Sequence, residues 1–502
     1  MNSSHEEVLI IGAGPTGLFL AGELARHGVR ARIIDRSPSP HTQTRATGVQ
    51  PAVLEVLARS GIVAPFIAEG ERVKSLRVFD AGMREAFVLD RPHRDSPYPF
   101  TCSIPQWRTE EILAGRVEEF GIPIERGVTA TEISSSPDGA VVECQGPHGR
   151  TFRIEADYLV GAGGAHGPVR GALHERLEGI TYPLRYLVAD VRADLPRGDE
   201  LLGVAISPAG MLMIAELPGG RNLLVMDMPD DWLPAESLGM PDVAAGLAMH
   251  LTSPFAISDL RWVSQYRTHR RMAPSFSQGR CFLAGDAAHL SSPLGGEGMN
   301  AGILDGVSLA WKLSSVLRRS GTPLLLEAYS VERQDIARQI LASSEATADF
   351  YYQLVAQARR GHPLAPPPQD PTRRVTSPLM LDLNISESPI IGFHGFTGIR
   401  GSLKPGDRFP ERTKLTGELH HLLVYGDLPD PGSNGFAARW RDVLVAMDGN
   451  KICPAERCGL PGTGAVLIRP DGYVGFQATS WDAASCTALE SFLGQQFIPR
   501  LT

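Results

Sequence analysis

The stretch from residue 285 to residue 300 reads GDAAHLSSPLGGEGMN and combines residue types that could do chemistry. It follows the apolar run 280–285, which predicts a strand, so Asp286 stands at a strand's carboxyl end, where open α/β sheets bind ligands. An aspartate here can accept hydrogen bonds from a hydroxyl-rich chain, although it could equally cap a helix. The glycines that lead into a helix after Gly298 leave backbone N–H groups bare toward a developing negative charge.

A second ligand-binding pattern lies near the amino terminus. The apolar run 7–11 is followed by GAGPTG at residues 12–17 and then by apolar residues at helical spacing. The run 29–34 predicts the next strand and ends at Asp35, 23 residues after the first glycine, where an acid binds the ribose of a dinucleotide. Strand, glycines, helix and acid in this order favour a nucleotide site over a plain glycine turn.

The three glycines have separate tasks in such a motif. Gly12 permits the tight turn, Gly14 lets the backbone approach the phosphates, and Gly17 allows the helix to pack closely on the sheet. The pyrophosphate would lie at the helix N-terminus, which begins with Pro15 and Thr16. An acid at the end of the second strand repels a 2′-phosphate, so the site favours the adenosine of FAD or NAD over that of NADP.

Two arginines follow the second strand. Arg36 comes directly after Asp35, and Arg45 lies ten residues after that acid, in QTRATGVQP. An arginine at this place can return to the pyrophosphate, as FAD would require, although an exposed loop arginine explains it equally well.

Length and composition describe a chain of several domains. The sequence has 502 residues, 43% hydrophobic and 21% charged, with a mean hydropathy of −0.07, which suits two or three cores. A formal net charge of −8 without a Lys/Arg run argues against a nucleic-acid partner. The apolar segment 8–25 is interrupted by Gly and Pro, so we expect no membrane contact and a cytoplasmic protein. Six scattered cysteines match no zinc or C-x-x-C spacing, so no metal is expected.

The middle of the chain predicts a helix and then a sheet. Gln106 opens a helical pattern after short β-like runs, where it either caps backbone or reaches a ligand. Residues 182–263 alternate β-like stretches with Gly/Pro turns, which predicts an antiparallel sheet inserted into the nucleotide-binding domain.

Two runs of this predicted sheet are rich in methionine. Alternation places Met211 and Met213 on one face of their strand, and Leu224 and Met226 on one face of the next. Such a face is either core or a wall for a large apolar substrate, because flexible methionine adapts to bulky ligands.

Four stretches give the chain a family resemblance. GAGPTG, the helix start at Gln106, YLVGAGGAHGPVR, and GDAAHLSSPLGGEGMN with the following GILDGVSLAWKL occur in this order. In order and approximate spacing the chain resembles the class A flavoprotein aromatic hydroxylases, the para-hydroxybenzoate hydroxylase-like family, over residues 5–360. The resemblance implies an α/β + β fold, with a Rossmann-like FAD-binding domain of the GR2 type and an inserted antiparallel-sheet substrate domain.

The resemblance also assigns site residues. It places the glycines of the first loop, Asp35 and Arg45 at the adenosine and pyrophosphate of FAD, and Gln106 and Asp286 at the ribityl chain. Pro293 would flank the reacting edge of the ring, where substrate meets cofactor. The remaining FAD contacts that it implies, several of them through backbone, are Arg36, Gly285, Gly296, Gly298, Met299 and Asn300.

Two positions depart from the family pattern. Gly163 replaces the aspartate of an Asp-Gly pair, so a carboxylate between the FAD and pyridine-nucleotide regions is absent. Glu297 stands where the family has Gln or Lys, and a carboxylate there repels an anionic reduced flavin unless it points away or is protonated. His166, in the same motif as Gly163, is a candidate NAD(P)H contact, with a plain surface histidine as the alternative.

The last third of the chain predicts long helices over residues 322–360 and then a Pro-rich connection, HPLAPPPQDPTRR. Beyond it, four runs in β-α-β-β-α order resemble a thioredoxin-like domain without C-x-x-C, which we expect to serve packing or assembly. The expected domains are an FAD-binding domain (1–72, 100–180, 265–320), a substrate sheet (73–99, 181–264), a helical segment with linker (321–375) and the thioredoxin-like domain (376–502).

The resemblance implies an FAD-dependent monooxygenase. NAD(P)H reduces FAD, O2 adds to give a flavin C4a-hydroperoxide, and one oxygen is transferred to an aromatic ring. The Met-rich sheet favours a bulky polyketide-type phenol, since a benzoate would call for an arginine clamp. Epoxidation, Baeyer–Villiger insertion, and an accessory FAD-binding protein that no longer hydroxylates remain as alternatives. We expect a monomer or homodimer.

Overall fold

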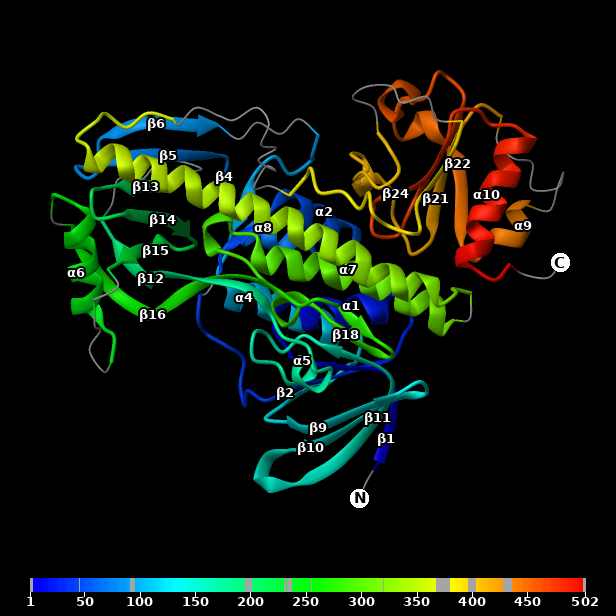
Figure 1. Ribbon diagram of the computed structural model, residues 1–502, viewed down its shortest axis with the longest axis horizontal. Coiled ribbons are helices and arrows are strands. Elements are labelled where there is room, and N and C mark those ends of the chain that lie inside the picture. Colours follow the sequence, from blue (N-terminus) through cyan, green and yellow to red (C-terminus); the bar gives the residue numbers. More distant parts are fainter. Residues whose placement is uncertain are drawn as a thin grey trace.

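Two eight-stranded sheets, a five-stranded sheet and a three-stranded sheet organise the described part of the chain in the computed structural model (Figure 1). In Figure 1 the amino-terminal sheet lies at the bottom, the second sheet at the left and the carboxyl-terminal unit at the upper right. The structure describes residues 3–44, 46–90, 95–194, 201–229, 232, 237–253, 255–318, 320–366, 380–395, 403–427 and 436–499.

The first sheet contains the predicted nucleotide-binding strands. β1 (Ser3–Ile11) lies between β11 (Thr151–Gly161) and β2 (Ala31–Asp35), and both pairings are parallel. Parallel strands bury both faces, and the apolar residues of β1 from Val8 to Ile10 are fully buried. The other strands of this sheet are β8 (Ile124–Arg126), β9 (Thr129–Ser136), β10 (Gly139–Gln145), β17 (Ser277–Gln278) and β18 (Cys281–Leu283).

The second sheet is the predicted insertion, and its antiparallel pairing is confirmed except where β13 (Leu201–Ile206) runs parallel to β5 (Ser75–Asp80). Its edge strand β19 (His289–Leu290) comes from the GDAAHL stretch, so this sheet reaches the predicted cofactor site. The remaining strands, in spatial order from β19, are β16 (Ile257–Met272), β12 (Glu178–Ala193), β15 (Arg221–Met228), β14 (Met211–Leu217) and, beyond β13 and β5, β6 (Glu85–Asp90).

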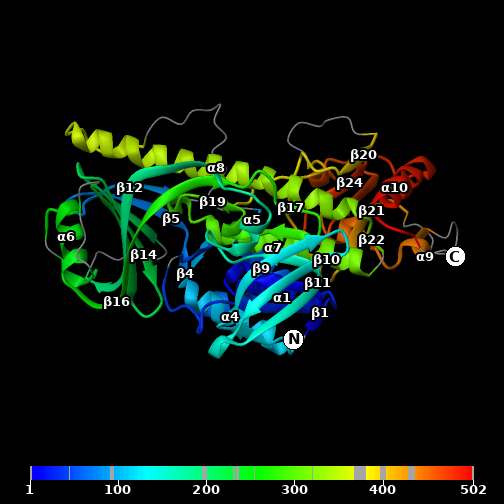
Figure 2. The ribbon, with the colours of Figure 1, turned by 60° about the horizontal axis from the view of Figure 1, so that its bottom comes forward.

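Helices cover both faces of the second sheet. α8 (Leu324–Arg359) runs along one face, and α6 (Met240–His250) covers the other, as Figure 2 shows from the side. α8 also packs on α7 (Gly298–Leu317) and, through its middle, on the short turn Pro293–Gly295. The sequence predicted several helices over residues 322–360, and the structure has one unbroken helix there.

The main elements of the carboxyl-terminal unit follow a β-α-β-β-β-α order, which has one strand more than the predicted β-α-β-β-α order. β21 (His420–Tyr425) pairs in parallel with β22 (Leu444–Asp448) and antiparallel with β23 (Gly464–Ile468). The remaining elements of this unit are α9 (Phe436–Trp440), β24 (Val474–Ala478), α10 (Ala483–Gln496) and the edge strand β20 (Gly392–His394).

Shorter elements complete the chain. Among the described residues, no helix is long and apolar enough to cross a membrane. All six cysteines are free. The elements not yet described are α1 (Pro15–Arg26), α2 (Pro51–Arg59), α3 (Val63–Glu69), α4 (Gln106–Glu119), α5 (Pro168–Ala172) and the three-stranded sheet of β3 (Gly48–Val49), β7 (Thr101–Ser103) and β4 (Glu71–Val73).

Candidate functional site

The amino-terminal glycine loop leaves one glycine facing open space. A Cβ at Gly12 would overlap the carbonyl of Ala162, and a Cβ at Gly17 would overlap the carbonyl of Gly12. A Cβ at Gly14 would meet no atom within 4 Å. Gly14 is also the N-cap of α1, whose first turn has no side-chain cap. The two outer glycines therefore serve packing, and the middle one leaves the backbone at the helix end open, as a phosphate site requires.

Thr16 joins the two predicted motifs. A Cβ at Gly285 or at Gly302 would overlap the Thr16 hydroxyl, so this side chain lies between the GDAAH turn and α7. A Cβ at Gly306 would lie only 3.0 Å from the ring of Phe19. Glycines on α7 thus allow α1 to approach closely, and the first loop and the later turn form one continuous surface.

Asp35 lies beside the glycine loop. Its carboxylate accepts the Ala13 N–H at 2.6 Å and the Ser37 N–H at 2.7 Å. This places the acid at the end of β2 next to the open side of the loop, as a ribose contact requires. Arg36 is exposed, and Arg45 lies outside the described residues.

The turn that carries Asp286 is held by a buried ion network. Asp305 of α7 is fully buried and accepts the Gly285 N–H at 2.8 Å. His289 lies 2.8 Å from the same carboxylate oxygen, and Arg333 of α8 donates to the other at 2.7 Å. Although burial opposes it, His289 and Arg333 hold the pKa of the Asp305 carboxyl below its usual range. Gly285 has a φ of +60°, which glycine adopts without strain.

Asp286 itself is exposed within a short 3-10 turn, three residues beyond Leu283, where β18 ends, rather than directly at the strand end as predicted. Sequence reasoning missed both Asp305 and Arg333. Asp305 lies in the GILDG stretch, but nothing in the sequence around it indicates that it pairs with Arg333.

Gln106 opens α4 as predicted, but its side chain does not cap the helix. Its amide donates to Glu110 at 2.8 Å, and its own N–H donates to the Ala46 carbonyl at 2.9 Å. The first bond lies within α4, and the second joins α4 to the segment that leads into β3. The side chain is half-buried, so it stays accessible to a ribityl chain.

Asn300 ties three segments together at the start of α7. Its amide donates to the carbonyls of Gly48 at 2.7 Å and Gly296 at 2.8 Å, and its oxygen accepts the Gln50 N–H at 2.8 Å. Its side chain is therefore structural, so the predicted cofactor contact of this segment stays with the backbone. No local sequence pattern marks Gln50.

Glu297 precedes α7 without capping it by its side chain. The residue is 1% exposed, and a Cβ at Gly295 would lie 2.7 Å from its Oε2, so the carboxyl is folded back over that glycine. Burial raises the pKa of Glu297 to about 8, while a hydrogen bond with Ser343 of α8 acts in the opposite direction. The raised pKa favours the neutral carboxyl at pH 7, which lessens the repulsion that sequence reasoning foresaw.

The residues present fit FAD. Two helix N-termini without side-chain caps, those of α1 and α7, converge on one surface with N–H donors for negative charge. Acids suited to sugar hydroxyls lie at the end of β2 and in the GDAAH turn, as Asp35 and Asp286. The open space at Gly14 admits the backbone approach that a pyrophosphate needs.

The methionines predicted as a substrate wall lie on opposite faces of the second sheet. Met211 and Met213 belong to an apolar cluster that includes Leu294, next to Pro293. Leu224 and Met226 belong to the cluster on the α6 side. The four residues therefore do not form one wall. Met226 pairs with Leu212 across β15 and β14, so these two share a face. Leu212 points to the opposite face from Met211 and Met213.

His166 is exposed in the loop after β11. It lies near His269 on β16, whose pKa is lowered by burial and by the charges of Arg271 and His166. Arg170 donates to the Ala287 carbonyl at 2.8 Å and to the Ala165 carbonyl, so this loop is fixed against the GDAAH turn.

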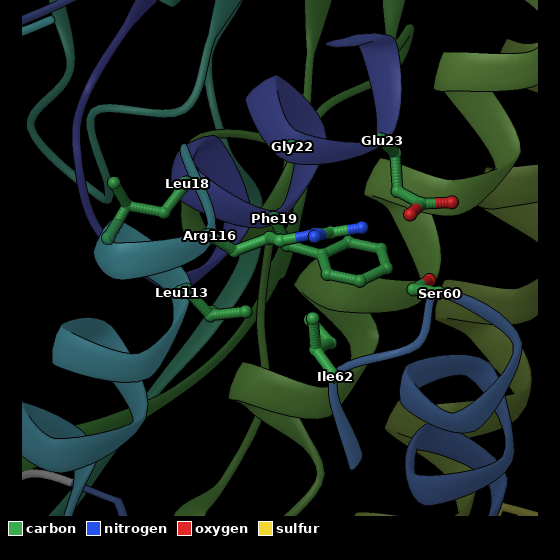
Figure 3. Close-up of a pocket in the computed structure, with 8 residues that line it drawn as sticks. All are labelled: Leu18, Phe19, Gly22, Glu23, Ser60, Ile62, Leu113 and Arg116. Atoms are coloured by element: carbon green, nitrogen blue, oxygen red, sulfur yellow. The ribbon is translucent and has the colours of Figure 1, made fainter. Parts of the chain in front are cut away.

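A small crevice lies apart from these residues. It is formed between α1, α4 and the segment after α2, with Phe19, Arg116 and Ile62 at its walls (Figure 3). None of the site residues predicted from the sequence lines it, and it faces the part of α1 beyond the glycine loop. We assign it no role in cofactor binding.

Comparisons with known proteins identify the family of this chain. The family model described as "FAD binding domain" matches residues 5–344. A 6-methylpretetramide 4-monooxygenase of Streptomyces rimosus is 32% identical over 96% of this chain and 92% of its own length. The solved anhydrotetracycline hydroxylase of Streptomyces rimosus is 28% identical, with a TM-score of 0.76 over 99% of this chain and 100% of its own. The complex of aklavinone-11 hydroxylase with FAD and aklavinone has a TM-score of 0.81 at 23% identity, over 98% and 99% of the two chains.

Proposed function

The chain belongs to the family with this FAD-binding domain and is an FAD-dependent aromatic monooxygenase, and we propose that it hydroxylates a bulky polycyclic phenol of the polyketide type. The observation that carries the proposal is the apolar face of the second sheet. This face brings Met211 and Met213 into one cluster with Leu294, beside Pro293. Relatives whose names contain pretetramide and anhydrotetracycline support a substrate of several fused rings.

The chain's own residues would hold FAD along its whole length. The α1 N-terminus, from Gly14 through Pro15 to Thr16, holds the pyrophosphate, and Asp35 holds the ribose. Asp286 and Gln106 hold the ribityl chain. The remaining backbone contacts that we propose for the ring and its surroundings are Gly285, Gly296, Gly298, Met299 and Asn300.

When bound, FAD supplies the redox chemistry that connects NAD(P)H, O2 and the aromatic ring. The chain's contribution is to orient the substrate and exclude water. Leu294 and Met213 are buried at 5% and 9% exposure, and α8 closes the same cluster with Tyr351. Pro293 would fix the edge at which the substrate meets the cofactor.

We place the NAD(P)H contact at the loop of His166. The exposed His166, with Arg271 and His269 beside it, offers cationic and polar groups to a phosphate. Gly163 provides no carboxylate there, so the attraction for an anionic nucleotide is not offset at that position.

The working unit that we propose is one chain, alone or as a homodimer. Free cysteines, most of them buried, are compatible with a reducing compartment such as the cytoplasm. The four domains with the boundaries given above remain part of this proposal.

A substrate panel tests the function. Purified protein saturated with FAD is mixed with NADH or NADPH, and nucleotide oxidation is followed with and without each compound. We expect polycyclic phenols to accelerate oxidation and yield a product with one added oxygen, and para-hydroxybenzoate to do neither. Acceleration by para-hydroxybenzoate alone would overturn the proposed substrate class while leaving FAD binding intact.

A further inference from the structure

Glu297 lies at the helix end where the proposed ring of FAD would be held. Its side chain is 1% exposed and turned back over Gly295. Oε2 has no hydrogen-bond partner among the described residues, and Ser343 of α8 hydrogen-bonds with the carboxyl. A buried carboxyl with one unpaired oxygen costs far more free energy as an anion than as a neutral acid.

Several charged groups on the neighbouring elements pair with one another. Asp305 of α7 pairs with His289 of the preceding turn and with Arg333 of α8. Glu345 of α8 pairs with Arg270 of β16 at 2.6 Å. Of the causes that move the pKa of Glu297, burial is the largest, and the Ser343 hydrogen bond opposes it. The described surroundings therefore supply a hydroxyl but no salt-bridge partner to compensate an ionised Glu297.

We propose that neutral Glu297 is a positioning residue, which keeps the positive end of α7 available to the negative charge that FAD gains on reduction. This rests on the proposed FAD site. Hydride transfer from NAD(P)H delivers two electrons and one proton and releases NAD(P)+, so the cofactor gains one net negative charge. An ionised Glu297 would place a second negative charge at the same helix end and oppose that gain.

The coupling acts in both directions. If ionised Glu297 weakens the binding of reduced FAD relative to oxidised FAD, then reduction must raise the pKa of Glu297 by the same free energy. Couplings between two sites in proteins typically correspond to affinity changes of about 5-fold to about 150-fold. We expect an effect in that range, appearing as pH rises past 8, where burial has placed the pKa of this group.

The test measures the reduction potential of bound FAD against pH in three proteins. In the wild type, the ratio of reduced to oxidised affinity falls by at least about 5-fold above the pKa of Glu297, beyond the pH dependence of free FAD. Glu297→Gln, which stays neutral, removes this added dependence. Asp227→Asn is the matched control. Burial also raises the pKa of Asp227, to about 7, but this residue lies in β15 of the second sheet and not at the α7 N-terminus. It should retain the wild-type profile of FAD.

Thermal unfolding of the FAD-free proteins gives a second readout. Wild type should lose stability relative to Glu297→Gln as pH rises from 4.5 toward 8, because the folded state binds the extra proton in that window. Ser343→Ala removes the bond that favours the anion, so it should shift the potential's inflection to higher pH. Superimposable potential profiles of wild type and Glu297→Gln would overturn the proposal. Absence of FAD binding in all variants would instead overturn the proposed FAD site, since these measurements need no substrate.

Discussion

Gly14 and Gly17 are three positions apart and have opposite surroundings. Gly17 is needed because a Cβ there would overlap the backbone, whereas Gly14 faces open space. The spacing of the glycines and the position of Asp35 follow from rules that concern neighbours in sequence, so these residues could be predicted. The face of the sheet on which each methionine lies could not be predicted. Alternation fixes faces within one strand, but the pairing of β14 with β15 decides which faces coincide.

Gly14→Ala separates ligand binding from folding. Its φ is −82°, which alanine adopts, and the new methyl group meets no atom within 4 Å. We expect FAD-free protein of wild-type stability and FAD affinity weakened at least about tenfold, because the methyl group occupies the approach of the pyrophosphate. Fluorescence titration with FAD and thermal unfolding measure the two effects.

Gly115→Ala in α4 is the control for this variant, since its Cβ also meets nothing within 4 Å and lies in another helix. It should bind FAD normally and gain up to about 1 kcal/mol in stability. Equal FAD affinity in wild type and Gly14→Ala would contradict the assignment of the α1 N-terminus.

Asp286→Ala tests the ribityl contact. Removing a charged hydrogen-bond acceptor costs about 1.5–3 kcal/mol, or roughly 10-fold to 150-fold in FAD affinity. The side chain is exposed, so the unfolding temperature without FAD should stay close to that of the wild type. Asp138→Ala, in the exposed β9–β10 turn, serves as a control that keeps full affinity. FAD occupancy is measured from absorbance. Wild-type occupancy in Asp286→Ala would refute the ribityl contact.

The strands and helices were more predictable from the sequence than the tertiary interactions that hold them together. Apolar periodicity indicates the strand before the GDAAH turn and the helix after it, because these patterns are local. The network of Asp305, His289 and Arg333 is tertiary, since its members come from α7, β19 and α8. Sequence reasoning therefore placed Asp286 at a strand end, whereas in the structure it lies in a turn that this network holds in place.

Asp305→Asn should loosen this turn. The change leaves the Arg333 guanidinium buried at 2% exposure without its carboxylate, which costs about 3–5 kcal/mol in similar sites. We expect urea unfolding at lower concentration, together with weaker FAD binding, because the Gly285 N–H loses its anionic acceptor. A variant with wild-type unfolding and wild-type FAD affinity would show that the network does not position the turn.

At the scale of the whole molecule, buried ion pairs join the carboxyl-terminal unit to the rest. Glu332 of α8 accepts from Arg469 at 2.6 and 2.8 Å and from Lys312 of α7 at 2.8 Å. Glu55 of α2 accepts from Arg412 at 2.6 Å, across 357 positions of sequence. Local patterns indicated most strands and the last helix of this unit but not its full order, which has one strand more than predicted. These ion pairs depend on the docked fold and could not be predicted from local patterns.

These pairs predict a loss of stability in acid. Burial opposes ionisation of Glu332, yet Arg469 and Lys312 lower its pKa to about 2 from a usual 4.5. Because the folded pKa is the lower one, the stabilisation is complete above pH 4.5 and is lost as pH falls toward 2. Urea unfolding at a series of pH values should show this fall, and Glu332→Gln should reduce its size.

Glu118→Gln, on the exposed side of α4, is the control and should follow the wild-type curve. Parallel acid profiles for wild type and Glu332→Gln would mean that this buried carboxylate does not link the units through its charge.

The central claim is that this chain binds FAD across the two helix ends and uses it to place one oxygen atom from O2 on a polycyclic phenol. Mass spectrometry of the product formed under isotope-labelled O2, with FAD, NAD(P)H and a panel of polyphenols, tests it most directly. The account predicts one labelled oxygen in the product. It also predicts less labelled product from Gly14→Ala than from the wild type at FAD concentrations that just saturate the wild type. An unlabelled product, or none from any polyphenol with FAD bound and reduced, would contradict it.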